Sequence, residues 1–304
     1  MAVRRRRSCL TVPGDDARKL AKAATLVVDE VILDLEDAVA AGRKDAAREI
    51  VGRALRDHEW RAGTVAIRVN RGSVDDLALV REARPDVVVL PKVESADELE
   101  SLPVPAEAQI ETARGLVECE RIAAAQGLEA LVLGPGDLAA SLGVPALTIG
   151  VGAHVDYALA RVVVAARAFG LAAVDGPFAV LDDDAGLRTS AARARALGYD
   201  GKWCIHPSQV AVCNEVFSAT PDELERARRM LAVEGVARLD GEMVDEANRR
   251  MAQAILARGG ESRTRRVATR RGLLGDALST AEQHAERDQQ GTGHREDERR
   301  HPAA

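Results

Sequence analysis

Carboxylate side chains follow two of the short apolar runs in this chain, at the point where each run ends. Glu111 comes directly after Ala108–Ile110, and Asp137 follows Ala130–Leu133 with three residues between them. Oxygen ligands without a cluster of Cys or His suit a hard divalent cation, Mg²⁺ or Mn²⁺. We therefore expect Glu111 and Asp137 to be a pair of metal ligands, with substrate and water filling the other positions.

The residues just before Asp137 form the glycine-rich turn Gly134-Pro135-Gly136. Such a turn after a strand is typical of a phosphate cradle, which binds through backbone N–H groups. A cradle disfavours nearby negative charge, so an aspartate at its end argues against phosphate.

A second group of charged residues lies where earlier apolar runs end: Asp34, Glu36, Asp37, Arg68 and Lys92. Arg68 is always charged and can hold a carboxylate through two parallel hydrogen bonds, so it is the expected anion binder. The three carboxylates have two interpretations. They support the metal site, in part through water, or they form salt bridges with Arg68 or Lys92.

Eight short apolar runs, most of them followed by a helical pattern, set the expected fold. The runs are Ser8–Val12, Val31–Leu35, Val65–Val69, Val87–Leu90, Ala108–Ile110, Ala130–Leu133, Ala172–Val174 and Lys202–Ile205. Most are continuous rather than alternating, which is typical of strands buried on both faces. Eight strand–helix units in about 250 residues indicate a (β/α)₈ TIM barrel. A doubly wound open sheet is the alternative, but no G-x-G-x-x-G follows the first run.

In such a barrel the catalytic groups lie at the carboxyl ends of the strands. These ends converge on one small volume, where several carboxylates would repel one another and take up protons. A divalent cation would remove that conflict, which supports the metal site inferred above.

The chain after the eighth run predicts a helical extension. Thr220-Pro221-Asp222-Glu223 has the pattern of a capping box with proline at the first helical position, and it begins a helix to about Val233. A turn around Leu239-Asp240-Gly241 and a last helix, Asp245–Arg258, follow. We expect a barrel over 1–219, the extension over 220–258, and a disordered tail over 259–304, which is polar and lacks apolar periodicity.

Composition argues against some classes of protein. The net charge of -6 disfavours nucleic-acid binding, since polyanion binders usually carry a basic face. No apolar run is long enough for a membrane span or a signal peptide, and the four cysteines have no metal or redox spacing. These features predict a cytoplasmic protein with reduced core cysteines. The run Arg4–Arg7 is either a solvated start of the chain or an attraction for an anionic substrate.

Several short motifs together resemble one family. They are "RSCLTVPG", "VILDLEDAVAAGRKDAAR", "IRVN", "LPKVES", "IETARG", "DGPF", "GKWCIHPSQVAVCNEVF" and "DGEMVD", which occur in order from residue 7 to about residue 257. This set is similar to the citrate lyase β-subunit/malyl-CoA lyase family of HpcH/HpaI-type aldolases. Within it, "GPGDLAASLGVPALTIG" looks most like malyl-CoA and β-methylmalyl-CoA lyases.

The resemblance implies a (β/α)₈ barrel that assembles as a homotrimer or homohexamer. It implies Mg²⁺-dependent cleavage of a β-hydroxyacyl-CoA into an acyl-CoA and glyoxylate or another 2-oxo acid. By motif, the metal ligands would be Glu111 and Asp137, the substrate-binding residues Arg68, Gly136, Val174 and Asp175, and the contacts to CoA phosphates Lys22 and, more weakly, Arg18. Asp245 of "DGEMVD" would be the acid/base, and it would act in a neighbouring subunit's site.

Other interpretations remain open. The position before Asp137 is often Glu in citrate-lyase-like members, so Gly136 points away from the citryl branch. Asp15 and Asp16 stand where basic or neutral residues are common, which weakens the expected CoA contacts. From the residues alone, Asp245 is better explained as a helix N-cap, and only the family pattern favours a catalytic role. The alternatives are a citrate lyase β-type subunit acting on a carrier-protein thioester, a CoA-independent 2-keto acid aldolase, and a non-catalytic metal-binding barrel.

Overall fold

The computed structural model describes residues 4–145, 149 and 153–259. The predicted disordered tail, 259–304, lies outside these residues except for Gly259, which ends the last helix. Residues 146–148 and 150–152, between the sixth and seventh strands, also lie outside them.

Eight parallel strands close into a barrel in sequence order, with the first strand paired to the last. They are β1 (Ser8–Pro13), β2 (Glu30–Asp34), β3 (Thr64–Arg68), β4 (Val87–Leu90), β5 (Ala106–Ile110), β6 (Leu128–Leu133), β7 (Ala172–Asp175) and β8 (Gly201–Cys204). The predicted TIM barrel is therefore confirmed, and each expected strand lies within two residues of the observed bounds. The open-sheet alternative is wrong because β1 and β8 pair and leave no edge.

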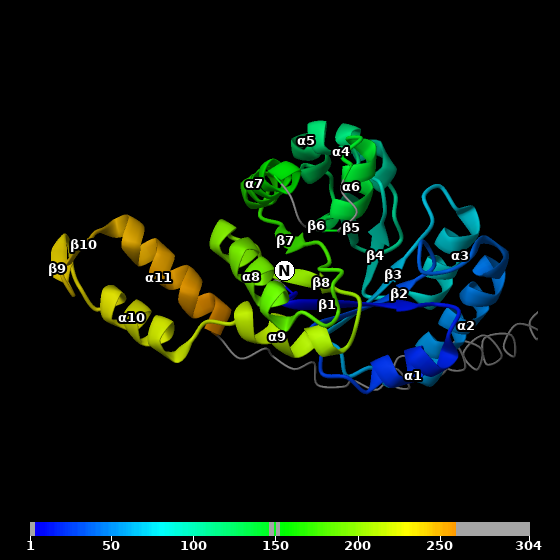
Figure 1. Ribbon diagram of the computed structural model, residues 1–304, viewed down its shortest axis with the longest axis horizontal. Coiled ribbons are helices and arrows are strands. Elements are labelled where there is room, and N and C mark those ends of the chain that lie inside the picture. Colours follow the sequence, from blue (N-terminus) through cyan, green and yellow to red (C-terminus); the bar gives the residue numbers. More distant parts are fainter. Residues whose placement is uncertain (1–3, 146–148, 150–152, 260–304) are drawn as a thin grey trace, which may run out of the picture. The chain divides into compact units, whose positions relative to one another are not determined.

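Helices cover the outside of the barrel (Figure 1). They are α1 (Ala17–Ala24), α2 (Lys44–Asp57), α3 (Val74–Ala83), α4 (Ala113–Val117), α5 (Cys119–Ala123), α6 (Pro135–Ser141), α7 (Ala153–Ala168), α8 (Asp184–Leu197) and α9 (Ser208–Val216), with 3₁₀ turns η1 (Ala41–Arg43) and η2 (Ala96–Leu99). The segment after β5 forms two short helices, α4 and α5, which are separated by Glu118 at φ -89° and ψ 7°. The crossover from β4 to β5 carries only η2.

Side chains of alternate strand residues fill the barrel interior in layers. One apolar cluster in the interior consists of Cys9, Ile32, Ala66, Val87, Val89, Val132, Val174 and Trp203. Because side chains alternate along a strand, Asp34 and Arg68 lie on the same inner face as Ile32 and Ala66, one step nearer the carboxyl ends. The strand faces that point outward pack against the helices in a larger core.

The amino-terminal end of the barrel holds a buried ionic cluster. Arg6 is 2% exposed and donates to Glu107 Oε1 at 2.5 Å and to Glu129 Oε2 at 2.8 Å, with Glu30 Oε2 at 3.6 Å. Arg6 is therefore neither solvated nor available to attract an anionic substrate, the two roles expected for the run Arg4–Arg7, because its charge is paired inside the fold. Glu30 Oε1 and Glu107 Oε2 are buried without a hydrogen-bond partner among the described residues.

The extension consists of α10 (Pro221–Leu231), the hairpin of β9 (Ala237–Leu239) and β10 (Glu242–Val244), and α11 (Glu246–Gly259). The capping box is present, with Thr220 accepting from the Glu223 main chain and Glu223 from that of Thr220. Arg195 of α8 pairs with Glu223 at 2.6 Å, and Arg258 donates to Gly198 O at 3.4 Å. These contacts connect the extension to the residues around α8.

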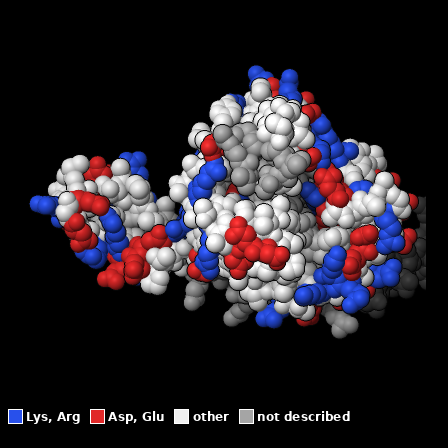
Figure 2. Space-filling model, in the orientation of Figure 1, with Lys and Arg blue, Asp and Glu red and all other residues white. Residues whose placement is uncertain are grey.

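All four cysteines are buried and none forms a disulfide. Across the part of the chain that the structure describes, no helix combines the length and apolar character needed to cross a membrane. On the face seen in Figure 2, acidic and basic side chains are interspersed rather than gathered into one basic field.

Candidate active site

Arg68 and Asp34 form a buried ion pair at the carboxyl ends of β3 and β2. The strand register places them opposite each other, which is why their side chains meet. Arg68 Nε donates to Asp34 Oδ1 at 2.8 Å and Nη2 donates to Oδ2. Burial opposes the charge, but the hydrogen bonds and the charge of Asp34 raise the pKa of Arg68 above its usual value. The two parallel hydrogen bonds expected for a bound anion are therefore made to the protein's own carboxylate.

Lys92 connects the two predicted metal ligands. Its main-chain N–H donates to Glu111 Oε1 at 2.8 Å, in a left-handed backbone conformation with φ 53°. Its ammonium pairs with Asp137 Oδ2 at 3.2 Å and Asp37 Oδ2 at 3.3 Å, and also with Glu36. Asp34, Glu36 and Asp37 all form salt bridges with Arg68 or Lys92, including Glu36 at 3.2 Å from Arg68 Nη1. Their support of a metal site stays a prediction.

Glu111 is 3% exposed, although it lies beyond the last residue of β5. Burial raises the pKa of Glu111 to about 7, Lys92 opposes the rise, and Asp137 and Glu36 add to it. The carboxylate rests against Gly134, where an added Cβ would overlap Glu111 Oε2 and Cβ. The first glycine of the turn is therefore needed to accommodate Glu111, a purpose that the sequence did not reveal.

Asp137 lies in the first turn of α6 rather than in a free strand-end turn. Gly134 is the residue before this helix and Pro135 is its first residue, a position where proline is favoured. A Cβ added to Gly136 would meet only the side chain of Ile149, at 3.4 Å. The backbone of this turn is thus close to Glu111 at Gly134 and more open at Gly136.

Five carboxylates and two cations meet in this region: Asp34, Glu36, Asp37, Glu111, Asp137, Arg68 and Lys92. Their formal charge is -3, so a divalent cation would relieve repulsion among them. Within 4–145, 149 and 153–259, no group of three or more His, Cys, Asp or Glu is placed to hold a metal ion. Two carboxylates completed by water and substrate oxygens are a usual Mg²⁺ environment, so the residues present fit that ion.

Val174 and Asp175 lie at the carboxyl end of β7, but neither side chain is free. Val174 is fully buried in the barrel interior. Asp175 pairs with Lys202, its register partner on β8, and accepts from Gly176 N at 2.8 Å. A contribution of this segment to substrate binding would therefore come from its main chain.

Arg18 and Lys22 are exposed on α1. Asp16 is the N-cap of this helix and accepts from Arg18 N and Lys19 N at 3.1 Å. Asp15 pairs with Arg43 at 3.3 Å. The two acidic residues of this loop thus have structural partners, and the CoA contacts of Lys22 and Arg18 stay a prediction.

Asp245 is the N-cap of α11. Its Oδ1 accepts from Ala247 N at 2.8 Å and from Asn248 N at 3.2 Å. None of its hydrogen bonds or ion pairs among the described residues reaches Arg68, Glu111 or Asp137. The structure accordingly brings Asp34, Glu36, Asp37, Glu111 and Asp137 together around Lys92 and Arg68, but not Asp245.

Two residues that face into the barrel at this site were not predicted from the sequence. Trp203 on β8 lies under Arg68, with the guanidinium carbon 5.6 Å from the ring centroid. Gln109 on β5 lies 3.4 Å from Arg68 Nη1. Strand alternation could have placed both on the inner face, because Gln109 is two residues before Glu111 and Trp203 sits inside the eighth run.

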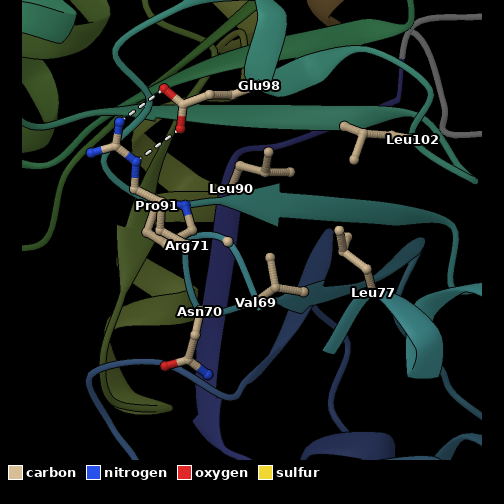
Figure 3. A pocket seen from close by; sticks show the side chains of 9 residues that line it. Val69, Asn70, Arg71, Leu77, Leu90, Pro91, Glu98 and Leu102 are labelled. Atoms are coloured by element: carbon tan, nitrogen blue, oxygen red, sulfur yellow. Dashed lines mark hydrogen bonds and ion pairs between the residues drawn. The ribbon is translucent and has the colours of Figure 1, made fainter. Parts of the chain in front are cut away.

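A cavity of about 400 Å³ lies outside the barrel, beside the carboxyl ends of β3 and β4 (Figure 3). Its walls are Val69, Asn70, Arg71, Gly72, Leu77, Leu90, Pro91, Glu98 and Leu102. Arg71 spans its rim to Glu98 at 2.8 Å. Since Arg68 faces inward, Val69 faces outward, so the cavity is separate from the predicted metal site. It lies where the β4–β5 crossover has η2 instead of an α-helix.

The protein is a closed (β/α)₈ barrel. A cluster of acidic residues at the carboxyl ends of β2–β6 is its predicted site for a divalent metal ion. Residues 7–207 match the model of the HpcH/HpaI aldolase/citrate lyase family. This chain belongs to that family, and its relatives are aldolase and lyase enzymes.

Three similar proteins bear on function. A (3S)-malyl-CoA thioesterase of Cereibacter sphaeroides is 36% identical over 269 residues, with 83% of this chain and 94% of that protein covered. An L-malyl-CoA/β-methylmalyl-CoA lyase of the same species is 34% identical, with 80% and 91% covered. The solved structure of CitE from Mycobacterium tuberculosis, in complex with magnesium, acetoacetate and coenzyme A, has a TM-score of 0.73 and 33% identity, with 86% and 99% covered.

Proposed function

We propose that this protein is a Mg²⁺-dependent carbon–carbon lyase that cleaves, or forms, a short β-hydroxyacyl-CoA such as malyl-CoA or β-methylmalyl-CoA. The products of cleavage would be an acyl-CoA and glyoxylate or another 2-oxo acid. The main support is the arrangement around Lys92, whose N–H holds Glu111 while its ammonium pairs with Asp137, next to Arg68. The relatives named for malyl-CoA chemistry and the solved relative with magnesium and coenzyme A support the substrate class.

Glu111 and Asp137 would hold the metal ion. When bound, the ion would act as a Lewis acid toward the carboxylate and carbonyl oxygens of the 2-oxo-acid part of the substrate. Arg68 would stabilise negative charge that develops on the hydroxyl-derived oxygen. Asp34 and Glu36 keep the guanidinium fixed, so Arg68 needs little rearrangement during the reaction.

In the cleavage direction the hydroxyl gives its proton to solvent, from which the acid/base regains one after each turnover, and its oxygen becomes the carbonyl of the 2-oxo acid. The bond to the thioester α-carbon breaks, and its electron pair passes to the thioester as an enolate. The enolate carbon then takes up a proton, for which we propose Asp245 of a neighbouring subunit in a homotrimer or homohexamer. A carboxylate enclosed there would have a raised pKa, suited to proton transfer near neutral pH.

A panel of short β-hydroxyacyl-CoA thioesters, assayed with Mg²⁺ and after chelation, tests the proposed class of reaction. We expect a 2-oxo acid from at least one thioester, and no product after chelation. Absence of a 2-oxo acid from every member would contradict the proposal. Turnover by the purified chain alone would also exclude a requirement for a carrier protein, which the citrate lyase β-type alternative has.

A second candidate is hydrolysis of a malyl-CoA-type thioester. It is favoured by the similarity to the (3S)-malyl-CoA thioesterase, which is 36% identical and covers 83% of this chain. Both candidates need the same substrate and the same metal ligands. They differ in the bond that breaks, so the products separate them.

A further inference from the structure

The Arg68 guanidinium lies over the ring of Trp203 inside the barrel. Trp203 comes from β8 and Arg68 from β3, on the far side of the closed sheet order. The guanidinium carbon is 5.6 Å from the ring centroid, and Trp203 is 4% exposed. A cation over the face of an indole is attracted by the ring, most strongly where water is excluded.

The edges of the same guanidinium are already occupied. Nε and Nη2 donate to Asp34, and Nη1 lies near Gln109 at 3.4 Å and Glu36 at 3.2 Å. Arginine has five N–H groups, and three of them donate to Asp34 and Gln109, while Glu36 forms an ion pair at Nη1. Nη2 makes one of these hydrogen bonds, so its second N–H remains available to a ligand. Asp34, Glu36 and Gln109 thus hold the edges of the guanidinium, and Trp203 is the aromatic ring that it faces among the described residues.

We infer that Trp203 is a positioning residue for Arg68. The flat indole holds the guanidinium at one angle across the barrel and so aims its remaining N–H. This inference rests on the proposed function, in which Arg68 stabilises charge on the substrate oxygen. The alternative is that Trp203 only fills volume, as its seven apolar neighbours in the interior cluster do.

Substitution separates the two roles. Trp203→Phe keeps a flat aromatic face, whereas Trp203→Leu keeps an apolar side chain without one. We expect Trp203→Leu to lose roughly tenfold in kcat and Trp203→Phe to stay within about threefold of the wild type. Trp60→Leu is the matched control, since Trp60 lies outside the site between α2 and β3, and it should keep wild-type kcat. Wild-type kcat in Trp203→Leu, or an equal loss in Trp203→Phe, would overturn the inference.

A fluorescence measurement tests the stacking without turnover and applies even if Trp203→Leu does not fold. The chain has two tryptophans, so Trp60→Phe leaves Trp203 as the sole indole. Adding Arg68→Ala uncovers one face of that ring, and we expect a shifted emission and stronger quenching by acrylamide. Unchanged emission and quenching would overturn the inference. If the wild type cleaves no β-hydroxyacyl-CoA, the proposed function fails, and this measurement still decides whether Arg68 covers the ring.

Discussion

The main-chain N–H of Lys92 donates to Glu111 Oε1 at 2.8 Å, while the ammonium of the same residue lies 3.2 Å from Asp137 Oδ2. One residue thus contacts both predicted metal ligands, from a left-handed backbone position at the end of β4. The ammonium supplies positive charge in a region where carboxylates outnumber cations. It therefore opposes repulsion among the carboxylates and also competes with a metal ion for them.

Replacing Lys92 by Met tests this dual role. The substitution removes a positive charge but keeps the main-chain N–H, so the cluster becomes more negative by one charge. We expect the metal-free protein to unfold at a lower temperature and the stabilisation by Mg²⁺ to increase. Thermal unfolding with and without Mg²⁺ measures both effects. A smaller Mg²⁺-induced shift than in the wild type would contradict the metal site around Glu111 and Asp137.

Gly134→Ala should weaken Mg²⁺ binding. An added Cβ would overlap the Glu111 carboxylate and displace it from the site. We expect the Mg²⁺ affinity, measured by calorimetry, to fall at least tenfold, which corresponds to about 1.4 kcal/mol. Gly136→Ala is the matched control for this readout, because its Cβ would meet only Ile149 at 3.4 Å. Equal Mg²⁺ affinities in the two variants would argue against Glu111 as a ligand.

Asp245→Asn separates helix capping from acid/base chemistry. Asn caps helices about as well as Asp, so α11 should keep its stability, whereas Asp245→Ala should lose about 1 kcal/mol. An amide cannot transfer the proton, so we expect Asp245→Asn to lose roughly 10²- to 10⁴-fold in kcat. Unfolding temperatures and initial rates measure the two effects. Wild-type kcat in Asp245→Asn would assign this residue to capping alone.

Mixed oligomers test whether Asp245 acts across a subunit interface. Arg68→Ala and Asp245→Ala subunits should each be inactive alone. If each site takes its acid/base from a neighbour, co-refolded mixtures regain activity at sites that combine an intact Arg68 with an intact Asp245. No activity in the mixture would count against action in trans.

The buried Glu30 should make stability depend on pH. Burial raises its pKa well above the ordinary 4.5 and Glu107 adds to the rise, while Arg6 opposes it. Glu30 therefore keeps its proton in the folded state at pH values where the unfolded chain has lost it. The stability that this provides is complete below about pH 4.5 and decreases as the pH rises through the folded-state pKa.

Glu30→Gln removes this dependence. We expect the stability of the variant relative to the wild type to increase from about pH 5 to about pH 8, as urea midpoints would measure. The other charged or titratable groups around Glu30 are Arg6, Glu107, Arg4 and Cys9, and all stay in place. A stability difference that is constant or shrinks with pH would contradict a protonated Glu30.

The local sequence pattern predicted the strands and many of the site residues. Contacts between segments that are distant in the sequence could not be predicted in this way. Continuous apolar runs identified all eight strands because both faces of each are buried. The charged residues at their ends could be brought together on topology alone, including Asp34, Arg68 and Lys92. The requirement for Gly134 beside Glu111 and the Trp203–Arg68 stacking depend on side-chain packing between strands, which no local pattern encodes. The buried Arg6 shows the same limit, since its partners Glu107 and Glu129 are more than 100 residues away.

The products formed from malyl-CoA test the central claim most directly. A reaction with Mg²⁺ would be followed for glyoxylate and for free CoA thiol at once, with Glu111→Gln as the metal-site control. We predict glyoxylate and acetyl-CoA in equal amounts, no free thiol, and loss of both products in the variant. Free thiol and malate without glyoxylate would contradict carbon–carbon cleavage and assign the site to thioester hydrolysis.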